Sequence, residues 1–183
     1  MKKVMMFLAM GGLLAAGSAM AANKSNVDVK PDAFSASRLY FGAGPSQNRL
    51  KENPFDIWED EALGYEVFAG YDLGMGFDQF KLMVEAGIFN SGTFENTVFI
   101  AGIPVYPDLE IRSNWAAAVI DYSPVKNLDL MLRLGYGQGD QGARGRFGGV
   151  GVGYWFHKNI GARLTYTDRD DVESVSLNIM YRP

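Results

Sequence analysis

Large apolar side chains alternate with small or polar ones along most of this chain. The segment 128–137, LDLMLRLGYG, places Leu128, Leu130, Leu132, Leu134 and Tyr136 at every second position. Successive side chains of a β-strand point to opposite faces, so this period of two predicts a strand with one continuous apolar face. The same alternation predicts strands over 38–44, 64–73, 80–88, 114–122, 148–156, 160–166 and 174–181.

The stretches between these eight segments alternate in length. Short connections cover 74–77, 123–127 and 157–159, whereas 45–62 and 90–111 are long and 138–143 and 168–172 are intermediate. Short turns on one side and longer loops on the other predict an all-β fold, an eight-stranded antiparallel up-and-down barrel. We expect all seven prolines to lie outside the strand centres, because proline cannot donate to a sheet ladder.

The second face of the predicted strands is rich in glycine and charge. Its ionisable residues are Arg38, Glu66, Asp72, Lys81, Glu85, Asp121, Asp129, Arg133 and Arg163. Glycine weakens a strand that faces water, but inside a narrow barrel it makes room for large neighbours. Four bases against five acids suit a closed interior in which charges are paired. We therefore expect the glycine face to point inward and the leucine face outward, toward lipid.

Aromatic residues support the outward assignment of the apolar face. Tyrosines and phenylalanines fall near both ends of that face with aliphatic residues between them, like the two interfacial girdles of a membrane barrel. The remote alternative is a soluble periplasmic, lipocalin-like binding barrel, which would carry its apolar face inside.

The N-terminus reads as an export signal. Lys2 and Lys3 precede an apolar stretch, and Ala19-Met20-Ala21 fits a signal-peptidase site, so 1–21 is predicted to be a cleaved signal peptide. Residues 22–36 are then a polar periplasmic lead-in, and 37–183 form the barrel. The formal net charge of −4 argues against nucleic-acid binding, and the chain contains no cysteine for disulfides.

The signal segment, the eight strands, GVGVGYWF at 149–156 and LNIMYR at 177–182 resemble the small outer-membrane β-barrel family of Gram-negative bacteria. This family includes the OmpA-type transmembrane domain and the OmpX/Ail and Opa proteins. The resemblance implies a monomer in the outer membrane with both termini in the periplasm. It also implies contact with outer-membrane lipid and lipopolysaccharide, and insertion by the outer-membrane assembly machinery. Family members commonly end in an aromatic residue, so Tyr181, followed here by Arg182 and Pro183, is the candidate assembly signal.

The resemblance leaves the biochemical role open. The barrel could present its loops for surface interaction or membrane integrity, or the interior charges could gate a narrow, porin-like channel for small solutes. We expect no enzyme, because His157, the one histidine, falls in a short turn. We also expect no cofactor and no metal centre; a divalent cation bridging Asp168–Asp171 and the first loop to lipopolysaccharide is a separate hypothesis.

The second long loop is unusually apolar. Its candidate contacts for an unknown extracellular partner are Phe94, Val98, Phe99, Ile100, Ile103 and Tyr106. The loop could protrude as a hairpin or fold over the barrel mouth as a lid, and Phe55 and Trp58 of the first loop could pack on it in either case.

Overall fold

A computed structural model describes residues 35–51, 58, 60–95, 99–100, 103–104, 107–139 and 144–183. The predicted signal peptide and nearly all of the lead-in lie outside these residues. Within the part of the chain that is described, no helix has the length and apolar character needed to cross a membrane.

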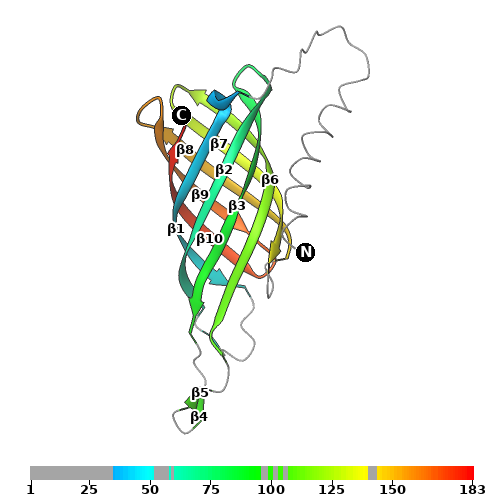
Figure 1. Cartoon of the computed structure of the whole chain (residues 1–183), viewed down its shortest axis with the longest axis vertical. Coiled ribbons are helices and arrows are strands. Elements are labelled where there is room, and N and C mark those ends of the chain that lie inside the picture. Colours follow the sequence, from blue (N-terminus) through cyan, green and yellow to red (C-terminus); the bar gives the residue numbers. More distant parts are fainter. Residues whose placement is uncertain are drawn as a thin grey trace, which may run out of the picture. The chain divides into compact units, whose positions relative to one another are not determined.

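Eight antiparallel strands close into one barrel (Figure 1). They are β1 (Leu39–Leu50), β2 (Glu61–Phe77), β3 (Phe80–Phe94), β6 (Leu109–Val125), β7 (Leu128–Gly139), β8 (Gly145–Trp155), β9 (Ile160–Asp168) and β10 (Val172–Tyr181). Strands adjacent along the barrel are adjacent in the chain, and β1 pairs with β10 to close the sheet. The predicted eight-stranded up-and-down barrel is confirmed. A short 3₁₀ turn, η1 (Ala36–Arg38), precedes β1.

The two ends of the barrel differ in their connections. Tight turns join β2 to β3 and β6 to β7, where Phe77 pairs with Phe80 and Val125 with Leu128. Asp78 and Asn127 occupy these turns with φ of 51° and 70°, a left-handed conformation that Asp and Asn tolerate. We call this the short-turn end; the C-terminus lies there too (Figure 1). The opposite, long-loop end carries a small hairpin of β4 (Phe99–Ile100) and β5 (Ile103–Pro104).

The barrel strands extend further toward the long-loop end than the sequence predicts. β1 continues to Leu50, β2 begins at Glu61, β3 reaches Phe94 and β6 begins at Leu109, so the predicted loops 45–62 and 90–111 are too long. Several inward residues of these extensions are polar but buried, such as Ser46 and Asn48 with at most 1% of their surface exposed, and they are mixed with buried apolar residues such as Leu50 and Phe94. A polar residue that faces a closed lumen resembles a loop residue in the sequence, which explains the error.

One proline departs from expectation. Pro45 lies in the middle of β1, opposite Tyr65 of β2. On its other side, Gly44 and Pro45 have no partner in the register with β10, which pairs Ala43 with Ile179 and then Ser46 with Ser176. The missing amide hydrogen of proline is thus accommodated by a local gap in the β1–β10 ladder.

The barrel carries its apolar residues outside. Leu134, Val150 and Ile179 are 54–60% exposed, whereas Arg133 and Glu66 inside the lumen are at most 2% exposed. The predicted aromatic girdles also face outward, with Tyr136 51% and Phe156 65% exposed. This orientation confirms the expected face assignment, and the lipocalin-like alternative is wrong because its apolar face would line the interior.

Glycines and aromatic rings interlock inside the lumen. In the strand register Tyr40 faces Gly70, Phe68 faces Gly42, and Phe147 faces Gly135. A Cβ atom added at any of these glycines would lie 2.1–2.4 Å from the facing ring. The rings also pack on each other around Trp115, with centroids 6.0 Å from Phe68 and 5.7 Å from Phe147. The prediction that inward glycines make room for large neighbours is confirmed.

We expect Gly135→Ala to destabilise the barrel by about 1–3 kcal/mol, because the added methyl group would overlap Phe147 and the carbonyl of Ala116. Gly148→Ala is the matched control, since its Cβ would meet only Leu134 at 3.7 Å. Urea unfolding of both variants in the same lipid vesicles measures the difference. Equal stabilities would contradict the interlocked packing.

Candidate functional site

Two glutamates and an arginine form the centre of a buried ion network. Arg133 of β7 lies 3.2 Å from Glu66 Oε1 of β2 and 3.7 Å from Glu85 Oε2 of β3. All three residues are at most 2% exposed. Arg133 also donates a 2.6 Å hydrogen bond from Nη2 to Thr167 Oγ1 of β9, so one guanidinium connects strands from both sides of the barrel.

A second arginine completes the crossing. Arg163 of β9 lies 2.6 Å from Glu85 Oε1, which also accepts a 2.8 Å hydrogen bond from the Tyr40 hydroxyl. β3 and β9 are four strands apart in either direction around the eight-stranded barrel, so this ion pair joins opposite walls. The network therefore spans the full width of the lumen.

A third arginine, which the sequence analysis did not identify as interior, closes the network toward the long-loop end. Arg169 follows β9 in the predicted loop 168–172, but it is 6% exposed and lies 3.2 Å from Glu66 Oε1. Arg169 points inward because the inward alternation of β9, through Arg163, Thr165 and Thr167, continues one step past the strand, whereas Asp168, Asp170 and Asp171 are exposed. Extending the period of two by one step would have found Arg169.

Aromatic rings cover the arginines of the network. Arg163 Cζ lies 4.3 Å from the centroid of Phe68, and Arg169 Cζ lies 4.1 Å from Phe89. Arg133 Cζ lies 4.7 Å from Trp115 and 5.5 Å from Phe147. Guanidinium groups are stabilised over aromatic faces, most strongly where water is excluded. The interlocked rings thus both fill the lumen and compensate part of the cost of burying its cations.

The ion network fills the middle of the lumen, and we call its five residues, Glu66, Glu85, Arg133, Arg163 and Arg169, the plug. Arg133 and Arg163 are at most 5% exposed and Glu66 2%, so solvent does not reach these ions. Buried ions are tolerated only with well-placed counter-ions and hydrogen bonds, and removal of one partner is costly. Each carboxylate here has an arginine partner, and each arginine has a carboxylate. The arrangement holds the walls of the barrel together and fills its middle.

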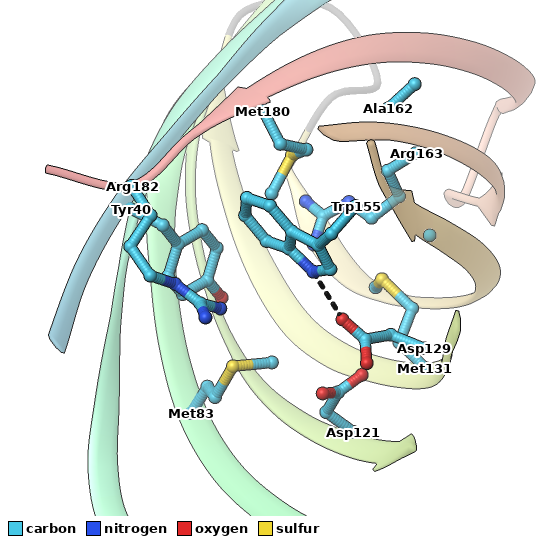
Figure 2. Close-up of a pocket in the computed structure, with 11 residues that line it drawn as sticks. Tyr40, Met83, Asp121, Asp129, Met131, Trp155, Ala162, Arg163, Met180 and Arg182 are labelled. Atoms are coloured by element: carbon cyan, nitrogen blue, oxygen red, sulfur yellow. Dashed lines mark hydrogen bonds between the residues drawn. The ribbon is translucent and has the colours of Figure 1, made fainter. Parts of the chain in front are cut away.

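A small cavity, lined by apolar side chains and two aspartates, lies between the plug and the short-turn end (Figure 2). Asp121 and Asp129 point into it from β6 and β7, with Arg163 and Arg182 nearby. Asp129 accepts a 2.6 Å hydrogen bond from Trp155 Nε1 and a 2.7 Å bond from Ser123 Oγ. The cavity encloses about 30 Å³, space for a few waters but too little for an organic solute.

The remaining predicted interior ions lie near the short-turn end, outside the central network. Asp72 Oδ1 accepts a 2.8 Å hydrogen bond from the amide of Gly74, where β2 bulges. The Arg38 guanidinium covers the same glycine, since a Cβ added there would lie 2.5 Å from Arg38 Nη1. Lys81 is half-buried and faces Asp121 across β3 and β6. The structure thus brings Glu66, Glu85, Arg133 and Arg163 together in the middle of the lumen. The other five predicted residues, Arg38, Asp72, Lys81, Asp121 and Asp129, lie nearer the short-turn end.

The predicted partner-binding loop needs one correction. Phe94 belongs to β3 and is fully buried, not exposed, because a bulge at Gly92, with φ of 77°, shifts the inward alternation of β3. Val98 and Tyr106 lie outside the described residues, and only the backbone positions of Phe99, Ile100 and Ile103 in β4 and β5 are described.

The predicted contact between the two long loops is confirmed for Trp58, whose Nε1 donates a 3.0 Å hydrogen bond to the carbonyl of Pro107. Phe55 lies outside the described residues.

Two further predicted positions lie at the short-turn end. His157 is exposed in the β8–β9 turn, where its Nδ1 accepts a 3.4 Å hydrogen bond from the amide of Asn159. Tyr181 is 51% exposed on the outer face, between Phe41 of β1 and Ile160 of β9 in the register. Arg182 stacks 4.4 Å from the Trp155 ring, and its carbonyl accepts a 2.6 Å bond from Asn159 Nδ2.

Comparison with known proteins identifies the fold. No family model and no curated protein matches this chain. A de novo designed transmembrane β-barrel matches with a TM-score of 0.52 and 13% identity over 82% of this chain and 98% of the designed chain. At this identity the likeness is one of fold: the chain has the architecture of an eight-stranded transmembrane β-barrel.

Natural outer-membrane barrels are also among the similar structures. Ail, the attachment invasion locus protein of Yersinia pestis, is 22% identical with a TM-score of 0.49, over 79% of this chain and 97% of Ail. Neisserial surface protein A is 17% identical with a TM-score of 0.43, over 80% of this chain and 98% of that protein. These are small barrels of the kind that the sequence resembles.

Replacing Arg133 by methionine should cost about 3–5 kcal/mol of unfolding free energy, because Glu66 and Glu85 would each lose a buried counter-ion. Arg112→Met is the control. Arg112 pairs with Glu110 at 2.7 Å on the surface, with its side chain 66% exposed, and should cost less than about 1 kcal/mol. Chemical denaturation of both variants in lipid vesicles tests the contrast. Similar losses in the two variants would show that the network contributes no more than a surface pair.

Proposed function

We propose that this chain is a closed, non-conducting barrel of the bacterial outer membrane that presents its long-loop end for contact at the cell surface. The observation that carries the proposal is the ion network across the lumen. Glu85 and Arg163 meet from opposite walls, and Arg133 beside them is fully buried. A solute would have to separate these pairs to pass.

The outer surface supports residence in a membrane. β7 to β10 contain 9–12 residues each. A tilted strand needs about 9–11 residues to cross the hydrocarbon layer, so these strands have the required length. Closure of the sheet satisfies the backbone groups that lipid cannot. Barrels of this type with an N-terminal export signal reside in the outer membrane, which is the location that the sequence resemblance implies.

The long-loop end supports a role in surface contact. β3 and β6 contain 15 and 17 residues, more than a crossing requires. The β3–β6 pairing continues to Phe94 and Leu109, and the β4–β5 hairpin lies in the segment between these two residues. The β3–β6 ladder and the β4–β5 hairpin (Figure 1) therefore form the part of the long-loop end that we propose for contact.

A refolded barrel should be electrically silent in a planar bilayer, and Arg133→Ala should produce small conductance steps because it opens space beside Glu66 and Glu85. Single-channel recording measures both. Arg112→Ala, at an exposed position, is the control for substitution of an arginine and should stay silent.

The narrow gated channel is the competing function. Steady conductance from the unmodified, folded protein would contradict the closed barrel and favour a lumen whose ion pairs rearrange. Silence of the wild type together with new steps in Arg133→Ala supports the plug.

A further inference from the structure

At the short-turn end of the barrel, the first and last strands meet without a turn between them. Turns connect β2 to β3, β6 to β7 and β8 to β9 there, whereas β1 begins and β10 ends. We call the β1–β10 ladder the seam; its last pair on this side is Phe41 with Tyr181. Chain ends fray unless further contacts hold them, so the seam is the part of this end that needs such contacts most.

The residue after β10, Arg182, is bonded to the β8–β9 turn through its backbone. Its amide donates a 2.9 Å hydrogen bond to the carbonyl of Asn159, and its carbonyl accepts a 2.6 Å bond from Asn159 Nδ2. The β9–β10 ladder ends one step earlier, where Ile160 faces Tyr181. Asn159 therefore extends the pairing of β10 past the end of the ladder and satisfies both backbone polar groups of Arg182.

The side chain of Arg182 turns into the barrel. Tyr181 before it is exposed on the outer face, and successive side chains of a strand point to opposite faces. The Arg182 guanidinium lies over Trp155, with Cζ 4.4 Å from the ring centroid, and Trp155 Nε1 is bonded to Asp129. Arg182 and Tyr40 both line the cavity (Figure 2), and the seam register, continued by one step, places them side by side.

The cavity favours a cation at this position. Asp121 and Asp129 both point into it (Figure 2). Of the other cations beside them, Arg163 is paired within the plug, and Lys81 faces Asp121 from β3. Neither aspartate forms a close ion pair in the described part of the chain, so the charge of Arg182 lowers the cost of burying them.

We propose that Arg182 is a latch that holds the end of β10 against the β8–β9 turn and thereby keeps the seam closed at the short-turn end. Three kinds of contact meet in this residue: two backbone hydrogen bonds, a guanidinium over an indole ring, and a cation near two carboxylates. Each contact is weak by itself at a half-buried position, but all are lost together when the end of β10 frays. The latch goes beyond the proposed function, because the plug would still fill the middle of a barrel whose seam frays at this end.

The test compares amide hydrogen exchange in the full chain and in its variants, all refolded in lipid vesicles. We expect Arg182→Ala with Asn159→Ala to speed exchange at 178–181 of β10 and 160–162 of β9 about tenfold or more, a factor equal to about 1.4 kcal/mol of lost contact. Exchange at 114–120 of β6, on the opposite wall, should change less than about twofold. Arg182→Ala alone leaves the backbone bonds in place and should give a smaller increase at the same amides, which keeps the test available if the double variant does not refold.

Lys158→Ala is the matched control. Lys158 is exposed in the same turn and makes no hydrogen bond or ion pair within the described residues, so its replacement should leave exchange at these amides unchanged. Three results would overturn the latch: unchanged exchange at the seam in the double variant, an equal increase on β6, which would show a general loss of stability, or an equal increase in Lys158→Ala. Failure of the closed-barrel function is separable, because it appears as conductance of the unmodified protein and not as exchange at the seam.

Discussion

Glu85 and Arg163 face each other across the barrel, 2.6 Å apart, and the interior is organised around that contact. The lumen buries aromatic and methionine side chains, but the charged groups among them are tolerated only where ion pairs and hydrogen bonds compensate the loss of water. The strand order makes the contact possible, because β3 and β9 lie on opposite walls. From other strands, Tyr40 donates a hydrogen bond to Glu85 Oε1, and Arg133 lies 3.7 Å from Glu85 Oε2.

The glycines determine how narrow the lumen can be. Phe68 and Phe147 lie over Gly42 and Gly135, where any side chain would overlap the ring. These rings in turn lie beside the guanidinium groups of Arg163 and Arg133. The glycine pattern, the aromatic packing and the ion network are therefore one arrangement, and its result is a filled interior. The surface that remains for contact with other molecules is the outer rim and the long-loop end.

Much of the fold follows from periodicity alone. The leucine row 128–134 and the alternation in 148–156, 160–166 and 174–181 predict strands whose ends agree with β7 to β10 to within three residues, because most of their outward positions are apolar. Prediction failed where the inward side chain was polar and the outward one no longer apolar, as at Asn48, which is buried in β1. It also failed where a bulge changed the alternation, as at Gly92 before Phe94.

The site was predictable in composition but not in pairing. The inward parity of Glu66, Glu85, Arg133 and Arg163 is visible in the sequence, but which carboxylate meets which arginine depends on barrel closure and on rotamers that no alternation encodes. The most direct test of whether the Glu85–Arg163 pair holds the barrel together is a double-mutant cycle. Glu85→Gln, Arg163→Met and the double variant are each unfolded in lipid vesicles, and their free energies of unfolding are compared. An ion pair that joins the two walls should give a coupling free energy of about 1.5–3 kcal/mol between the two positions. Losses that add to within about 0.5 kcal/mol would contradict it.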